Sequence, residues 1–467
     1  SQNEQDSRHH AIAAKVPMLE PSDSAECLAF TKLAYELSEQ FDTPVLLRLS
    51  TRISHSRSLV ELSPREERPL KEYHKDVMKN VMMPAMARGA HVKVEKRTEA
   101  LRRWAETASI NTVEYNDKRI GIICAGTTYT YAKEALGERA SFLKLGMVNP
   151  LPVNLIVEFA RNVGQVYVIE ELDDIIETHC RKHGVPVIGR LLFPAIGEYS
   201  QATVREALLG ENRPYDAFEG DIPARPPVLC AGCPHRGLFY ALKKLKVYVS
   251  GDIGCYTLGA SAPLSSIDAC VCMGASISGL HGYNTARGKE SAKKSVAVIG
   301  DSTFCHSGIT GLVDIAYNKG ISTVIVLDNS ITGMTGHQNN PANGLTISGD
   351  PTVAIDLEAL AHAIGIRRVV TVDPFDVEAT RAAIEAELQV EEPSLVISRR
   401  PCALLKTVKH KPALKVIADK CTGCKACLQV GCPALSHRPN EKNGRTAAVI
   451  DPTQCVGCEV CAQACRF

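Results

Sequence analysis

Eight of the eighteen cysteines are gathered in two short runs near the end of the chain. The first run is C-x-x-C-x-x-C followed, after four residues, by a fourth cysteine and a proline; the second repeats the triplet with a three-residue gap. This spacing is typical of domains that bind two 4Fe–4S clusters, in which the fourth cysteine of each run ligates the other cluster. One cluster is therefore expected on Cys421, Cys424, Cys427 and Cys465. The other is expected on Cys432, Cys455, Cys458 and Cys461.

Two structural zinc sites are the alternative for these cysteines. Zinc domains usually use two separated C-x-x-C pairs rather than triplets, so the spacing favours iron and sulfur. Either kind of site needs reduced thiolates, which a disulfide-forming compartment does not maintain. We therefore expect a cytoplasmic protein.

A second chemical pattern lies in the middle of the chain. Gly300-Asp301-Ser302 is followed, after 26 intervening residues, by Asn329. A Gly-Asp-small turn and a later asparagine at this separation form the thiamine diphosphate motif, because a small turn at a helix N-terminus admits a diphosphate. Asp301, Asn329 and the main-chain carbonyl of Ile331 would supply three oxygens to Mg²⁺. For the tripeptide alone, a plain strand-to-helix turn is the alternative; the spacing and the strand context favour the cofactor site.

Short β-branched runs alternate with helical segments through most of the chain. Strands are expected at 120–126, 166–169, 246–249, 269–273, 294–301, 322–330 and 395–398. Such alternation predicts an α/β fold with several doubly wound parallel-sheet domains, followed by a small ferredoxin-like α+β domain. Ligands bind such sheets beyond the carboxyl ends of the strands, where Asp301 and Asn329 fall.

Changes in composition divide the chain into five parts. A charged stretch and two segments rich in Gly, Pro or Lys separate the strand-rich regions. The expected parts are 1–60, linker helices at 61–115, a transketolase C-terminal-like α/β domain at 116–212, the thiamine diphosphate and Mg²⁺ domain at 213–405, and the cluster domain at 406–467. The net charge of +1 and the absence of a long apolar run give no reason to expect nucleic acid or a membrane as a partner.

Several motifs resemble those of a known family. They are EPSDS (Glu20–Ser24), TRISHS (Thr51–Ser56), LCAGCPHRG (Leu229–Gly237), SGDIGCYTLG (Ser250–Gly259) and NSITGMTGHQNNP (Asn329–Pro341). Together with the cluster domain, they resemble the alpha (large) subunits of indolepyruvate ferredoxin oxidoreductases, which belong to the 2-oxoacid:ferredoxin oxidoreductases. The resemblance covers essentially the whole chain.

The resemblance implies thiamine-dependent oxidative decarboxylation of an aryl pyruvate. Indolepyruvate or phenylpyruvate would react with coenzyme A to give an aryl-acetyl-CoA and CO₂, and the electrons would pass through the clusters to ferredoxin. A smaller beta subunit would complete a hetero-oligomer. Residues 1–60 would be the end of an N-terminally truncated pyrimidine-binding domain, with the activating glutamate before Ser1.

The resemblance also implies further site residues. Cys230, Cys233, Cys255 and Cys402 would hold a third 4Fe–4S cluster; the alternative is that these thiols only pack beside the cofactor. From the residues themselves, Gly254 and His337 are expected to contact the cofactor. His235 and His306 are candidate acid–base groups, with a satisfied structural histidine as the alternative for each. Arg52 and His55 could meet a substrate carboxylate, with surface pairing as the alternative.

Two other classes of function stay open at this point. A pure electron-transfer subunit would leave the pairing of Asp301 with Asn329 unexplained. A non-oxidative thiamine decarboxylase would leave the eight cluster ligands without a purpose.

Overall fold

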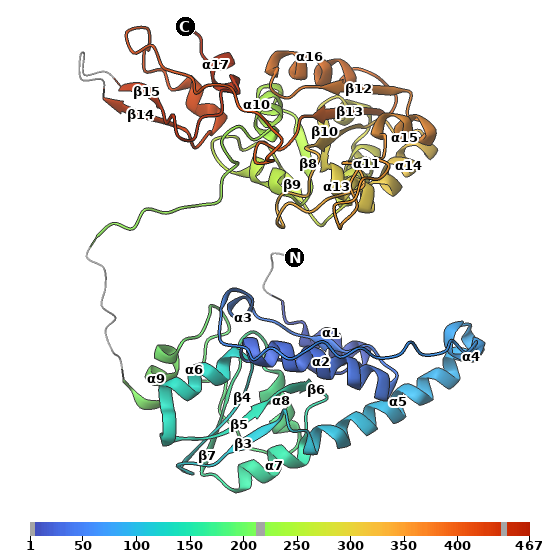
Figure 1. Ribbon diagram of the computed structural model, residues 1–467, viewed down its shortest axis with the longest axis vertical. Helices are drawn as coiled ribbons and strands as arrows, with labels where there is room; N and C mark the ends of the chain where they lie inside the picture. Colours follow the sequence, from blue (N-terminus) through green and yellow to red (C-terminus); the bar gives the residue numbers. More distant parts are fainter. Residues whose placement is uncertain (1–4, 212–219, 440–445) are drawn as a thin grey trace. The chain divides into compact units, whose positions relative to one another are not determined.

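A computed structural model describes residues 5–211, 220–439 and 446–467. The chain forms two compact units, Ser1–Gly220 and Asp221–Phe467, whose division falls inside the predicted Gly- and Pro-rich linker. Figure 1 shows both units as ribbons. Among the helices that the structure describes, none combines the length and the apolar character of a transmembrane span.

The first unit is built on a four-stranded sheet in the order β3-β5-β4-β7. Its strands are β3 (Thr112–Glu114), β4 (Ile120–Ala125), β5 (Ser141–Leu145) and β7 (Gln165–Ile169). β4, β5 and β7 run parallel, and β3 pairs with β5 in antiparallel fashion. β4 and β5 are buried along almost their whole length, because helices cover both faces of the sheet. These helices are α6 (Thr127–Leu136), α7 (Val153–Arg161), α8 (Ile175–Lys182) and α9 (Gln201–Leu209).

The N-terminal segment packs onto this unit through a smaller sheet. β1 (Met18–Leu19) pairs with β2 (Leu46–Leu47) and, in antiparallel fashion, with β6 (Met147–Asn149). The helices of this segment are α1 (Arg8–Ala14), α2 (Ser24–Phe41) and α3 (Thr51–His55). The segment expected at 1–60 therefore shares a sheet with the following α/β segment.

The predicted linker helices are only partly present. Residues 56–76 contain no helix or strand, and α4 (Val77–Asn80) and the long α5 (Pro84–Thr107) follow. Leu101 and Ala105 on α5 are buried, and Ala105 packs beside Leu19 and Phe30, so this helix belongs to the first unit. The strand β3, at the end of the segment, was not expected from its charged composition.

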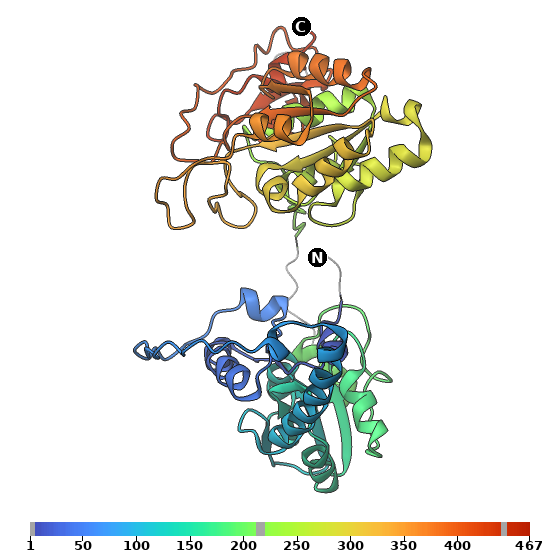
Figure 2. The same cartoon turned by 90° about the vertical axis from the view of Figure 1, so that its right-hand side faces the viewer.

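The second unit contains a six-stranded, fully parallel sheet with helices on both faces (Figure 2). The strand order is β12-β13-β11-β10-β8-β9. The strands are β8 (Tyr248–Gly251), β9 (Ala269–Cys270), β10 (Ser295–Gly300), β11 (Thr323–Asp328), β12 (Arg368–Val372) and β13 (Ser394–Arg399). The covering helices include α10 (His235–Leu245), α11 (Ala275–Arg287), α14 (Ile309–Tyr317), α15 (Leu357–Ile364) and α16 (Val377–Leu388). The prediction of a doubly wound α/β fold is confirmed, although β9 is shorter than expected and β5 and β12 were missed.

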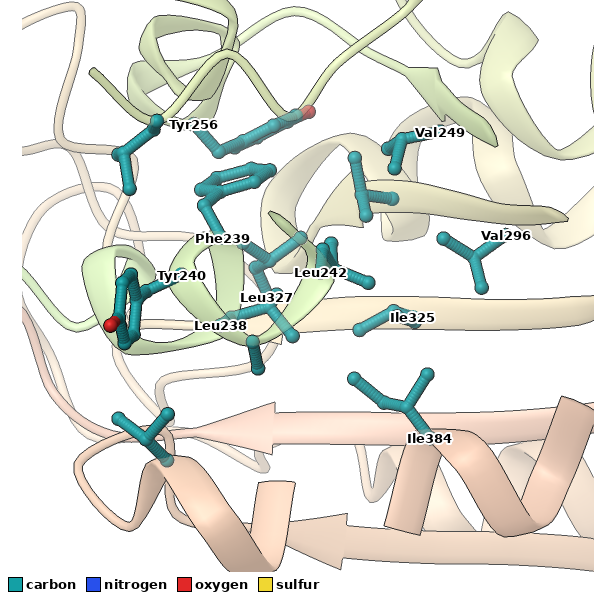
Figure 3. Packing of buried hydrophobic residues seen from close by; sticks show 14 of the residues in the cluster. Leu238, Phe239, Tyr240, Leu242, Val249, Tyr256, Val296, Ile325, Leu327 and Ile384 are labelled. Atoms are coloured by element: carbon teal, nitrogen blue, oxygen red, sulfur yellow. The ribbon is translucent and has the colours of Figure 1, made fainter. Parts of the chain in front are cut away.

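One of the two hydrophobic clusters of this unit lies between α10, α16 and one face of the sheet; the other includes Ile277 of α11, Leu312 of α14 and Leu357 of α15. Leu238 and Leu242 of α10 point toward Ile325 and Leu327 of β11, and Phe239 packs against Tyr256 (Figure 3). The buried middle positions of β10 and β11 are apolar, and the buried polar residues Ser295, Thr323 and Asp328 lie at the strand ends.

The C-terminal module is small and loop-rich. It contains the antiparallel pair β14 (Leu435–Pro439) and β15 (Thr446–Ile450), the 3₁₀ turn η4 (Ala426–Val430) and the short helix α17 (Val460–Gln463). Val430 and Val460 join the hydrophobic cluster of α10, so the module is packed against the parallel-sheet domain.

Candidate active site

Asp301 and Asn329 lie at one edge of the six-stranded sheet. Asp301 directly follows β10 and Asn329 directly follows β11, and these strands pair in parallel with Gly300 opposite Leu327. Parallel pairing therefore brings together two residues that are distant in the sequence.

The Asp301 carboxylate is buried, and only one of its two oxygens accepts a hydrogen bond from the described residues. Its side chain is 2% exposed, and Oδ1 accepts a 2.7 Å hydrogen bond from the Ser302 amide. Oδ2 is buried and has no hydrogen-bond partner in the described part of the chain. Burial, with a contribution from Asp328, raises the pKa of Asp301 to about 7. An unpaired buried carboxylate oxygen fits a cation ligand, because a bound Mg²⁺ would compensate its charge.

Asn329 connects this edge to α10. Its Nδ2 donates to Nε2 of His235 over 3.4 Å, and its Oδ1 accepts from the amide of Ile331 over 3.4 Å. His235 is 4% exposed, and burial lowers its pKa to about 4. The ring is therefore neutral near pH 7 and presents a lone pair toward Asn329.

Glycines permit close approach of backbone to an aromatic ring at this edge. A Cβ on Gly254 would lie 2.3 Å from the Tyr256 ring, and one on Gly300 would lie 2.6 Å from it. The Tyr256 hydroxyl donates to the Ile253 carbonyl over 3.0 Å. Larger residues at 254 or 300 would displace this ring and the turn above it.

The structure separates the three candidate histidines. His306 is exposed in a π-helical turn (Phe304–Gly308), with Nδ1 3.1 Å from the Ser307 hydroxyl. His337 is exposed and has a φ of 63°. Within the described residues only His235, of the three, is hydrogen-bonded to the Asp301–Asn329 pair.

Three buried polar residues at this edge were not singled out from the sequence. Asp252 follows β8 and accepts hydrogen bonds from the amides of Gly274 and Ser276, which ties that strand to the start of α11. Asp328 is paired with Arg399 at 2.8 Å. Asn340 is 5% exposed, and its Nδ2 has no partner among the described residues. Asp252 and Asn340 lie inside motifs that the sequence displays, but those motifs do not reveal which of their polar residues are buried.

Four cysteines from three segments of the chain gather beside this edge: Cys230 and Cys233 from the loop before α10, Cys255 from a 3₁₀ turn, and Cys402 after β13. Burial raises the pKa of the Cys233 thiol to about 12, and the neighbouring Cys230 and Cys402 thiols add to the rise. Cys230 and Cys402 also act on Cys255. The Cys402 amide donates a 2.9 Å hydrogen bond to the Asn329 carbonyl, because residues 399–402 continue beside β11 after β13 ends. The predicted third set is therefore together in space.

The first predicted set in the C-terminal module faces one cavity of about 340 Å³. Its lining includes Cys421, Cys424, Cys427 and Cys465. Burial is the main cause that raises the pKa of the Cys427 thiol, and the other three thiols of the set add to the rise against a backbone hydrogen bond that lowers it. This shared cavity fits the predicted four-ligand set.

The second predicted set faces a cavity between the module and α10. Its lining includes Cys432, Cys455, Cys458 and Cys461, together with Ala231, Gly232 and Arg236. Burial raises the pKa of Cys461 to about 12, and the other three thiols and Cys427 add to it. The two sets are thus neighbours, and the second also adjoins the Cys230–Cys233 segment.

No three Cys, His, Asp or Glu side chains come close enough to hold a single metal ion in residues 5–211, 220–439 and 446–467. The ligands of a cube-shaped cluster stand farther apart than those of one ion. The two cysteine sets of the module each line a shared cavity, and this arrangement fits 4Fe–4S clusters better than single metal ions.

Arg52 belongs to the first unit, whereas the residues of this site belong to the second. Its guanidinium forms two 2.6 Å hydrogen bonds with the Glu198 carboxylate, and both side chains are about half exposed. His55 is also exposed. This arrangement matches the surface pairing that the sequence left as the alternative.

Comparison with known proteins decides the family. Indolepyruvate oxidoreductase subunit IorA of Thermococcus kodakarensis is 39% identical over 100% of this chain and 79% of its own length. The same subunit of Methanothermobacter thermautotrophicus is 37% identical, over 100% and 78%. This chain belongs to the IorA family. It is therefore a subunit of a 2-oxoacid:ferredoxin oxidoreductase.

Two domain families also match this IorA-family chain. Residues 252–398 match the thiamine pyrophosphate enzyme, C-terminal TPP binding domain, which includes Asp301 and Asn329. Residues 420–467 match the 4Fe-4S dicluster domain, which includes all eight cysteines of the two runs. The thiamine-binding and 4Fe–4S character predicted from the sequence is thereby confirmed for these parts of the chain.

Similarity to solved structures is low. The 2-oxoglutarate:ferredoxin oxidoreductase from Magnetococcus marinus aligns with a TM-score of 0.34 and 18% identity, covering 40% of this chain and 68% of that one. A thiamin diphosphate-dependent enzyme from Mycobacterium smegmatis aligns with a TM-score of 0.29 and 17% identity, covering 64% of each. At these scores neither alignment carries an argument about the IorA-family chain.

Proposed function

We propose that this chain is the alpha subunit of an enzyme that oxidatively decarboxylates an aryl pyruvate with coenzyme A, forming aryl-acetyl-CoA and CO₂ and passing electrons to ferredoxin. The observation that carries the proposal is the hydrogen bond between Asn329 and Cys402. It joins the candidate cofactor edge to the third cysteine set, so that oxidation and electron removal would take place side by side. Indolepyruvate as the substrate is supported by the names of the relatives.

The chain's own residues would hold the cofactor at the edge of the sheet. Asp301, Asn329 and the Ile331 carbonyl would bind Mg²⁺, and the Gly300–Ser302 turn and Gly254 would admit the diphosphate. Thiamine diphosphate, when bound, supplies the carbanion stabilisation that loss of CO₂ from a 2-oxoacid requires. The unpaired Oδ2 of Asp301 supports this assignment.

His235 would serve as a neutral hydrogen-bonding group. Its buried ring is held by Asn329, and its low pKa keeps it uncharged at working pH. Such a ring can fix the orientation of the asparagine that binds the metal. His306 and His337 stay candidates for contacts with substrate or diphosphate.

Electrons would leave through the three cysteine sets in turn. The set containing Cys402 adjoins Asn329, and the set containing Cys458 lies next to the Cys230–Cys233 segment. The set containing Cys427 follows, and its Cys424 and Cys465 are exposed. Electrons would thus travel from a buried site toward the surface, where ferredoxin accepts them.

A smaller beta subunit would complete the enzyme as a cytoplasmic hetero-oligomer. The exposed thiolates of two clusters favour a reducing compartment.

The test is reduction of a viologen dye by the complex of alpha and beta subunits. The reaction is expected to require thiamine diphosphate, coenzyme A and a 2-oxoacid, with indolepyruvate and phenylpyruvate compared against pyruvate and 2-oxoglutarate. Reduction that is independent of added thiamine diphosphate in cofactor-stripped enzyme would favour an electron-transfer subunit. Release of CO₂ without dye reduction would favour a non-oxidative decarboxylase.

A further inference from the structure

Arg236 is a fully buried cation at the junction of two cysteine sets. Its side chain is 2% exposed at the start of α10. It lines the cavity that Cys432, Cys455, Cys458 and Cys461 share. It also lies three residues after Cys233, and its charge acts on both Cys233 and Cys458.

The hydrogen bonds of Arg236 all go to main-chain carbonyls. Nη1 donates to Val430 over 2.7 Å, and Nη2 donates to Leu229 over 2.5 Å and to Cys230 over 2.9 Å. Its Nε is buried and has no partner among the described residues. These contacts hold the guanidinium in place between the parallel-sheet domain and the module.

The described part of the chain offers Arg236 no carboxylate within ion-pair distance, although the other buried arginine, Arg8, is paired with both Asp6 and Glu170. Burying a cation without a counter-charge is unfavourable, because the charge loses its hydration and gains no compensating attraction. A 4Fe–4S cluster with four thiolate ligands is negatively charged and becomes more so when it accepts an electron. Net charge and hydrogen bonding are the features that set its potential.

We propose that Arg236 is the counter-ion of the cluster on Cys432, Cys455, Cys458 and Cys461, and that its charge raises the reduction potential of this cluster. The inference rests on the proposed function, since it places an electron carrier between the cofactor edge and the exit. A higher potential at this position draws electrons away from the Cys230–Cys233–Cys255–Cys402 set. Arg236 is thus a positioning residue that acts on the direction of electron flow rather than on the substrate.

A second arginine provides a matched control. Arg400 also acts on the Cys458 thiolate, but it is about a third exposed, and it pairs with Asp373 and stacks on Phe375. Its charge is already compensated and partly hydrated, so removing it should change the potential much less.

The test is an EPR-monitored redox titration of the complete alpha–beta complex, with iron content measured in each preparation. Arg236→Gln is expected to lower the midpoint potential of one module cluster by an amount equivalent to about tenfold in its reduction equilibrium, or about 59 mV for one electron. Arg236→Lys is expected to retain most of the wild-type potential, and Arg400→Gln to leave it nearly unchanged. Equal shifts in Arg236→Lys and Arg236→Gln, or no shift in a fully iron-loaded Arg236→Gln, would overturn the proposal and leave Arg236 as a tether.

If Arg236→Gln fails to assemble, Ala231 allows the same test, because it lines the same cavity. Ala231→Asp and Ala231→Asn differ only in charge, so the aspartate variant is expected to have the lower potential. Identical potentials would contradict the proposal. If the wild-type complex showed no thiamine-dependent dye reduction, the proposed function would be refuted instead. The failure of the Arg236 proposal and the failure of the proposed function are therefore distinguishable.

Discussion

The carbonyl of Asn329 accepts a 2.9 Å hydrogen bond from the amide of Cys402. The two residues are distant in sequence and lie beyond the ends of the paired strands β11 and β13. The contact places a candidate metal ligand next to a candidate cluster ligand. The same sheet edge would therefore hold the cofactor and the first electron acceptor, and a small displacement of one would shift the other.

Asp301→Asn is expected to weaken Mg²⁺-dependent binding of thiamine diphosphate by about tenfold or more, or about 1.4 kcal/mol or more. Asparagine has nearly the same size as aspartate but carries no negative charge, so the unpaired oxygen Oδ2 is no longer available to bind the cation. Isothermal titration with Mg²⁺ present measures the effect. The cofactor-free variant should be at least as stable as the wild type, since an uncompensated buried carboxylate has been removed. Unchanged affinity would contradict the assignment of Asp301.

Cys402→Ser is expected to lower the iron content of the alpha chain from about twelve to about eight per chain, since three 4Fe–4S clusters become two. Iron analysis with EPR of the reduced protein measures this. Cys27→Ser is the control, because Cys27 lies on α2 of the first unit. About eight irons in the wild type would rule out the third cluster.

Gly423→Ala is expected to prevent assembly of the cluster on the first cysteine set of the module, which lines the cavity of about 340 Å³. Gly423 has a φ of 73°, and a Cβ there would lie 2.2 Å from the Thr446 carbonyl oxygen. Gly184→Ala is the matched control, with a φ of 76° and open space around the added carbon. The control should lose only about 1–2 kcal/mol of stability, the cost of a left-handed alanine. Loss of one EPR signal in the first variant alone confirms the steric cause.

Lys420→Glu is expected to raise the KM for an acidic ferredoxin by about three- to tenfold, with viologen reduction unchanged, because charges at the rim of an interface act mainly on encounter. Lys415, Lys420 and Lys425 are exposed and line the cavity of the cluster whose Cys424 and Cys465 reach the surface. The KM of the wild type should rise with salt more steeply than that of the variant. A variant that affects both acceptors equally would argue against docking at this surface.

His179 makes the stability of the first unit dependent on pH. Burial is the largest cause that lowers its pKa from 6.5 to about 4. The unfolded chain therefore binds a proton at a higher pH than the folded chain, and the free energy of unfolding falls as pH drops from about 6.5 to about 4. In the His179→Gln variant, the decrease in the free energy of unfolding over this pH range is expected to be smaller by about 1–3 kcal/mol. Urea unfolding at pH 7.5 and pH 5 measures it, with the exposed His10→Gln as control.

The sequence by itself determined the parts of this protein whose chemistry is local. Three of the four ligands of each cluster lie close together in sequence, because one short loop surrounds the cluster. The cysteine triplets were therefore sufficient to predict the dicluster domain. Asp301 and Asn329 were recognisable because each follows a strongly apolar strand, and the alternation of strands and helices was sufficient to predict a parallel sheet.

Only the tertiary structure decided which distant residues meet. Strand order places Cys402 beside Asn329, and packing of the module against α10 buries Arg236 next to Cys458. It also separates the buried His235 from the exposed His306 and His337, which look alike as sequence. Burial and long-range pairing are set by the whole sheet and its covering helices, and no local spacing encodes them. For that reason the electrostatic character of Arg236 and Asp301 becomes visible only in the folded chain.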